Sequence, residues 1–119
     1  MRRIAMFTIE QLNEYGADTK EGLKRCMNMP DFYLRLVGMV AKDEHLALLK
    51  EAVAAGNLEA GFEAAHALKG VLANLALTPV LKPVSEMTEL LRARTEMDYT
   101  PLLAETEREW NRLLDMIKG

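Results

Sequence analysis

The chain has 119 residues, half of them hydrophobic, which suits one domain with a buried core and argues against a disordered chain. Its 15 basic and 18 acidic residues give a net charge of −3, and no Lys/Arg run exceeds Arg2-Arg3, so a nucleic-acid-binding face is not expected. The single cysteine, Cys26, excludes an internal disulfide and a cysteine-based zinc site and favours a reduced, cytoplasmic setting.

The N-terminal part predicts two short helices. The apolar stretch that starts at Ile4 is too short for the core of a signal peptide, and no segment approaches the roughly 20 apolar residues of a membrane span. Thr8 is expected to cap a helix over residues 9–15, with Gln11 completing a capping box. A second helix starts at residue 18 or 19 and runs to about residue 27. Neither is long enough to be stable alone, so both must pack on the rest of the chain.

The remainder predicts longer amphipathic helices with short breaks. No run alternates with period two for long enough to be a strand. We therefore expect an all-α fold: an antiparallel four-helix bundle over about residues 30–118, with the two short helices packed on it, in one domain of residues 1–119. Pro83 leaves open whether one helix starts later than Pro79. The predicted helices run from Pro30 to Val40, from Leu46 to Gly56, from Asn57 to about Ala76, from Thr78 to Leu91, and from Thr100 to Ile117.

His66 occupies an unusual place in the third of these helices. On a helical wheel it lies about a third of a turn from the centre of the apolar face. Its neighbours one turn away are Phe62 and Glu63 before it and Lys69 and Gly70 after it, with Ala73 one turn further on. A glycine inside a helix costs about 1 kcal/mol relative to alanine, which favours a role in the close approach of another molecule.

This setting suits phosphoryl transfer. A neutral imidazole nitrogen is a good nucleophile near pH 7 and can take a phosphoryl group from an aspartyl phosphate. Lys69 could offer its ammonium to the phosphoryl oxygens, and Gly70 leaves room for the donor. The nearby carboxylates of Glu59 and Glu63 are a weak metal signal, so any magnesium is expected on the partner.

The segment His66-Ala67-Leu68-Lys69-Gly70 resembles the signature of histidine-phosphotransfer (Hpt) domains, as does the run 73–75. Segments 15–18, 22–23, 26–27, 32–37 and 83–91 are also similar to members of that family. The resemblance implies an exposed, phosphorylatable His66 that carries a phosphoryl group between receiver domains of response regulators or hybrid sensor kinases. It implies no cofactor of the chain's own, Mg²⁺ on the receiver, and a cytoplasmic phosphoprotein, which we expect to be monomeric.

The resemblance also suggests neighbours for His66 and shows departures from the family pattern. By spacing, Thr88 and Arg92 are candidates to hydrogen-bond the imidazole or lie beside it. The family's serine pair is replaced by Val71-Leu72 and its later glycine by Ala76, which suggests altered packing between the two central helices. No ATP-binding glycine box is present, so the domain is a phosphotransfer carrier with no expected kinase activity of its own.

Other interpretations remain open at this point. The bundle could be a non-catalytic docking module for a receiver or another signalling partner, or an unrelated helical regulator with a chance motif. His45 is expected to be a surface or capping residue, because a metal site shared with His66 would lack supporting ligands. Cys26 and Trp110 are expected in the core.

Overall fold

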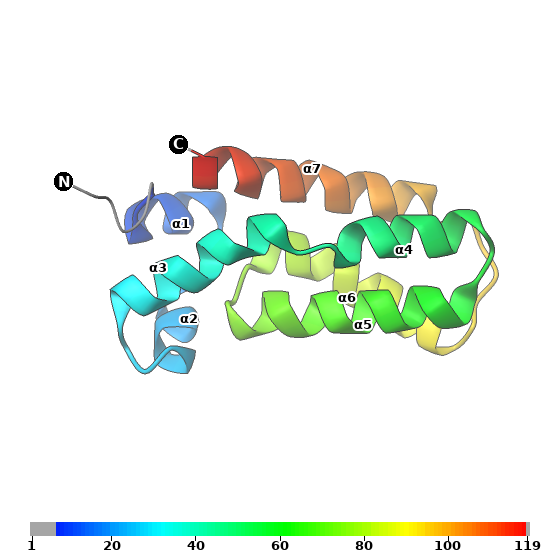
Figure 1. Ribbon diagram of the computed structural model, residues 1–119, viewed down its shortest axis with the longest axis horizontal. Helices are drawn as coiled ribbons and strands as arrows, with labels where there is room; N and C mark the ends of the chain where they lie inside the picture. Colours follow the sequence, from blue (N-terminus) through cyan, green and yellow to red (C-terminus); the bar gives the residue numbers. More distant parts are fainter. Residues whose placement is uncertain (1–6, 119) are drawn as a thin grey trace.

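The structure is a computed structural model that describes residues 7–118. These residues form seven α-helices and one short 3₁₀ helix, with no β-strand among them (Figure 1). The predicted all-helical fold is therefore confirmed. The Arg2-Arg3 pair and the start of the apolar stretch at Ile4 lie outside the described residues.

The two N-terminal helices begin as their capping residues predict. At the start of α1 (Ile9–Tyr15), the Thr8 hydroxyl accepts the Gln11 N–H at 3.1 Å, and the Gln11 side chain accepts the Thr8 N–H at 2.9 Å. Asp18 caps α2 (Thr19–Arg25) by accepting the Glu21 N–H at 3.2 Å. These bonds satisfy backbone donors that a helix start leaves without intrahelical partners, so the sequence sets both starts.

The next segment is a helix interrupted once. α3 (Pro30–Met39) continues into the 3₁₀ helix η1 (Val40–Lys42), and α4 (His45–Ala54) follows after a short break. At the break, the Asp43 carboxylate accepts the His45 backbone N–H at 2.8 Å and lies 2.9 Å from His45 Nδ1. His45 is therefore the partly exposed first residue of α4, and Asp43, not His45, supplies the side chain that binds a backbone N–H at this helix start.

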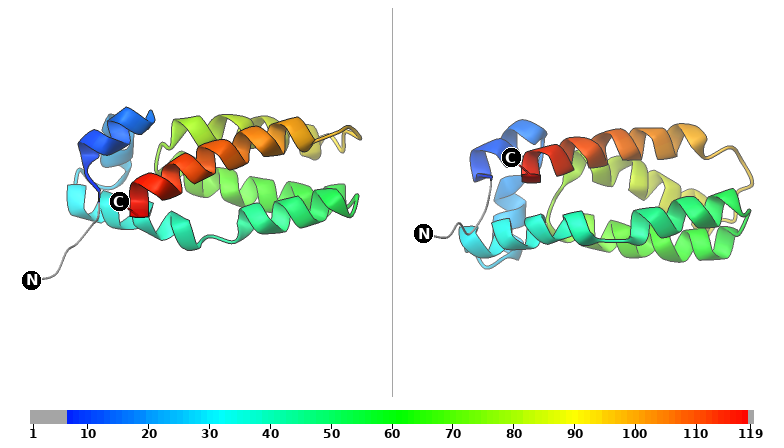
Figure 2. Two further views of the ribbon diagram at one scale, coloured as in Figure 1. Left: turned by 90° about the horizontal axis from the view of Figure 1, so that it is seen from above. Right: turned by 45° about the horizontal axis from the view of Figure 1, so that its top comes forward.

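The remaining helices are α5 (Leu58–Asn74), α6 (Thr78–Arg92) and α7 (Thr100–Lys118). α4 packs along α5, α5 along α6, and α6 along α7. Figures 1 and 2 show these helices running lengthwise through the molecule, with α1 and α2 at the end where α3 begins. α6 starts at Thr78, so Pro83 lies inside the helix and is buried there, which settles the alternative left open above.

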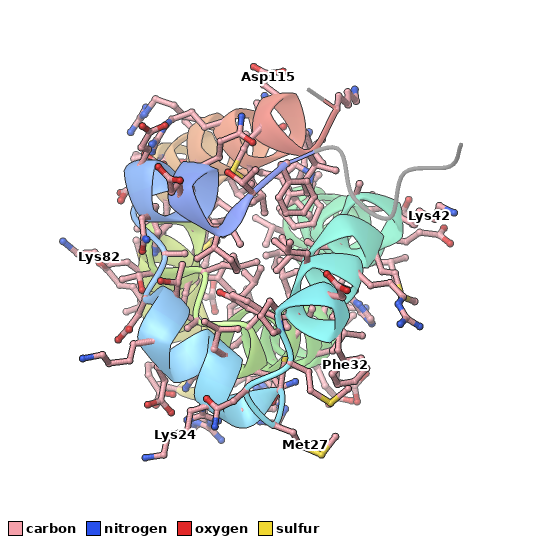
Figure 3. The ribbon with its side chains drawn as sticks, turned by 90° about the vertical axis from the view of Figure 1, so that its left-hand side faces the viewer. Lys24, Met27, Phe32, Lys42, Lys82 and Asp115 are labelled. Carbon is pink, nitrogen blue, oxygen red and sulfur yellow. The ribbon has the colours of Figure 1, made fainter. Side chains whose placement is uncertain are left out.

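One continuous core joins the N-terminal helices to the rest. It extends from Phe7 to Leu113, and Cys26 and Trp110 belong to it as predicted. The buried Tyr33 hydroxyl donates to the Leu75 carbonyl at 2.9 Å, which ties α3 to the end of α5. Figure 3 looks onto the end that carries α2 and α3 and shows Lys24, Lys42, Lys82 and Asp115 pointing outward from this packed interior.

The turn between α5 and α6 gives Ala76 a backbone role that the sequence did not indicate. Ala76 has a φ of +55°, in the left-handed region that favours glycine. Its N–H donates to the Ala73 carbonyl at 3.1 Å, and the Leu77 N–H donates to the Leu72 carbonyl at 3.0 Å, as in a glycine-terminated helix end. The alanine that stands in place of the family glycine therefore takes a strained backbone angle at this turn, and the expected change in packing between the helices stays a prediction.

Candidate functional site

His66 lies in the middle of α5 with its side chain exposed. The helix is capped by Asn57, whose side-chain oxygen accepts the Ala60 N–H at 3.0 Å. Ala65 and Leu68 are fully buried and anchor the helix against the core. The imidazole is therefore presented by a rigid element, and within residues 7–118 its ring nitrogens make no hydrogen bond. A ring nitrogen that is free in this way can act as a nucleophile.

The ring of Phe62 orients the imidazole. The two rings stack with centroids 5.4 Å apart and an interplanar angle of 25°. The guanidinium carbon of Arg92 lies 4.9 Å from the centroid of the Phe62 ring, and that of Arg94 lies 5.4 Å from it. Cation–π attraction of this kind holds positive charge near the histidine without a direct contact between them.

Lys69 pairs with a carboxylate of the neighbouring helix. Its Nζ lies 3.7 Å from Oε2 of Glu89 on α6. Arg92 also binds Glu89, with Nε 3.3 Å from Oε1 and Nη2 3.4 Å from Oε2. The hydrogen bond from Arg92, followed by the attraction of the Arg92 and Lys69 charges, holds the pKa of the Glu89 carboxyl below its ordinary value. Glu89 is thus an anion that faces both cations of the site.

Gly70 leaves the surface beside His66 open. A Cβ built at Gly70 would meet no other atom within 4 Å, so no packing within the chain requires a glycine there. A groove of about 750 Å³ starts at this point and is bordered by His66, Gly70, Val71 and, from α3, Leu36 and Met39. The surface beside the imidazole is therefore hollow and largely apolar.

The structure places the other predicted site residues differently. Glu63 is exposed and borders a second groove, between α4 and α5, together with the exposed Leu48. Ala73 is half-buried on α5. Thr88 was a candidate to hydrogen-bond the imidazole or to lie beside it. The first alternative is wrong, because Thr88 is fully buried and its hydroxyl donates to the Val84 carbonyl at 2.7 Å. A side chain bonded to its own helix in this way is not available to His66.

Sequence reasoning missed two parts of the site. The spacing of Phe62 and His66, four residues apart on one helix, contained the signal for their stacking. Nothing in the sequence indicated Glu89, because its contact with Lys69 depends on how α5 and α6 lie against each other. Within residues 7–118 no group of three or more His, Cys, Asp or Glu side chains is arranged to hold a metal ion. None of the helices described there combines the length and apolar character of a membrane span.

A family model of the Hpt domain matches residues 42–118, well over half of the chain. The chain belongs to the Hpt domain family. Membership implies a part in phosphorelay signalling, in which Hpt domains interact with receiver domains. The match contains α4 to α7, and therefore His66, whereas α1 to α3 lie before it. Comparison with curated proteins and with solved structures gave no match.

Proposed function

We propose that this Hpt domain carries a phosphoryl group on His66, accepting it from the aspartyl phosphate of one receiver domain and passing it to an aspartate of another. The observation that supports this most is the exposed imidazole, which has no hydrogen bond within residues 7–118 and lies beside Gly70, where no side chain blocks the surface. A receiver must bring its phosphoaspartate within bonding distance of the ring, which bulky side chains around it would prevent.

The proposed step exchanges one bond for another. A lone pair on an imidazole nitrogen attacks phosphorus, and the new P–N bond forms as the P–O bond to the receiver aspartate breaks. The aspartate leaves as a carboxylate with the electron pair of that bond, and the reverse sequence loads the second receiver. Lys69, one helical turn from His66, offers charge to the phosphoryl oxygens, while Phe62 holds the plane of the ring. We expect Mg²⁺ to be supplied by the receiver.

The same proposal covers the finer architecture. We assign the α3–α4 segment, α5, α6 and α7 as the four antiparallel helices of the bundle, with α1 and α2 packed on one end. The continuous core from Phe7 to Leu113 supports treatment of the chain as one domain. The buried, lone Cys26 is consistent with the cytoplasmic setting in which we propose that the domain works as a monomer.

The test is transfer from receiver domains that carry radiolabelled aspartyl phosphate. We expect wild-type protein to gain acid-labile, alkali-stable phosphate and His66→Gln to gain none. His45→Gln is the matched control, because it removes the chain's other histidine and should label normally. Labelling of His66→Gln would refute the assignment, and tight receiver binding without any transfer would favour the non-catalytic docking module.

A further inference from the structure

The Glu89 carboxylate pairs with Lys69, the cation that would also pair with a phosphoryl group on His66. It comes from α6, whereas His66 and Lys69 come from α5, and its carboxylate joins the two helices by the 3.7 Å approach to Lys69. Carboxylate and phosphoryl oxygens are both anionic acceptors for an ammonium donor. Lys69 can therefore pair with Glu89 or with the phosphoryl group, and pairing with one weakens its interaction with the other.

We infer that Glu89 is a positioning residue that holds Lys69 while His66 is unphosphorylated and gives it up when a phosphoryl group arrives. This inference rests on the proposed function and adds a competitor to the site. Glu89 would thereby lower the affinity of His66 for the group, which suits a carrier that must also release it.

Arg92 fixes the position of Glu89. Its guanidinium lies over the Phe62 ring and binds both carboxylate oxygens of Glu89, so the carboxylate has a second partner that does not depend on Lys69. The approach of Lys69 to Glu89 is longer, at 3.7 Å, and the lysine side chain is one-third exposed. Of the two cations, Lys69 is the one that the structure leaves free to change partners.

The size of the effect follows from the exposure of the pair. Ion pairs between solvent-exposed side chains typically contribute less than about 1 kcal/mol, equivalent to a factor of about five. Removing the Glu89 charge should therefore make Lys69 about two- to fivefold more available to an incoming anionic donor. The gain should shrink as salt screens the charges.

The experiment uses phosphoramidate, a small anionic donor that needs no receiver. His66 attacks its phosphorus, and the P–N bond to the protonated nitrogen breaks to release ammonia. We expect Glu89→Gln to raise the labelling rate of His66 about two- to fivefold at low salt. Gln retains an acceptor oxygen for Arg92, so the fold around position 89 should be kept. Glu86→Gln is the control: it removes the same charge from an exposed site on α6, and no ion pair of Glu86 occurs within residues 7–118.

The decisive comparison is made in a Lys69→Met background, where Glu89→Gln should give no gain. Equal rates for Glu89→Gln and Glu86→Gln would overturn the inference, and so would a gain that persists without Lys69. Failure of phosphoramidate to label wild-type His66 would overturn the inference, whereas the proposed function is decided separately by transfer from a receiver. Labelling with the predicted gains, but without transfer from any receiver, would refute the proposed function alone.

Discussion

Enlarging Gly70 should make the protein more stable and less able to exchange phosphate. Gly70 lies inside α5, is exposed, and would meet no atom within 4 Å if it carried a Cβ. Gly70→Ala therefore gains helix propensity without a clash, about 0.5–1 kcal/mol in the free energy of unfolding. For a chain of this length, that corresponds to a rise of about 2–5 °C in Tm, which thermal melts followed by circular dichroism would detect.

The loss of function should grow with the size of the side chain. Gly70→Gln adds a good helix former whose side chain projects into the space that a receiver would enter. Crowding a packed contact costs about 1–3 kcal/mol, so transfer from a receiver should slow by about fivefold to 150-fold. Labelling by phosphoramidate should stay close to the wild-type rate, because that donor is too small to need the same space.

Gly61, on the same helix, is the matched control. A Cβ there would lie 3.3 Å from Cδ2 of Leu91, so Gly61→Ala must displace a buried side chain and should gain less stability than Gly70→Ala, or lose some. Its effect on receiver transfer should be small, since the residue is buried away from His66. Wild-type transfer rates in Gly70→Gln would refute the argument that the glycine keeps a partner's path open.

Three further predictions concern the fold. Met27 is 70% exposed with a φ of +58°, so Met27→Gly should relieve a left-handed strain and raise the unfolding free energy in urea by about 0.5–1 kcal/mol. Arg112→Met removes a 2.9 Å bond to the Tyr15 carbonyl and a cation over the Tyr15 ring, and should lower the unfolding free energy by about 1–2 kcal/mol in the same assay. Burial, followed by the nearby charges of Cys26 and Asp18, raises the pKa of Tyr33 from 10.0 to about 12. Because folding favours the neutral phenol, the contribution of Tyr33 to the free energy of unfolding is complete below about pH 10 and is lost as pH rises through about 12. Urea midpoints measured across this range should therefore fall for the wild type, and they should fall less for Tyr33→Phe.

The helix boundaries were predictable where local chemistry decides them. The Thr8 and Gln11 capping box, the Asp18 cap and the Asn57 cap each satisfy backbone donors within three residues of the capping side chain. The flank position of His66 also followed from helical periodicity alone. Local residue spacing was therefore enough to predict both the motif around His66 and the helix that carries it.

The sequence was insufficient where the answer depends on tertiary packing or on a backbone angle. Spacing suggested Thr88 as a partner of His66, but it could not show that Thr88 faces the protein core and bonds to Val84. The positive φ of Ala76 was also missed, because the sequence alone does not reveal which residue of a turn takes the left-handed conformation. Both facts belong to the way α5 meets α6.

The two helices of the site therefore divide its chemistry. α5 carries His66, Lys69 and Gly70 at spacings that any straight helix would preserve, so the proposed ability to accept a phosphoryl group depends on the local sequence. α6 contributes Glu89 and Arg92, whose influence depends on the contact between the helices. Changes at His66 should abolish transfer and changes at Lys69 or Gly70 should slow it, whereas changes in the α6 residues should shift how firmly the group is held. A relay whose partners differ in phosphoryl affinity could be retuned through α6 without touching the nucleophile.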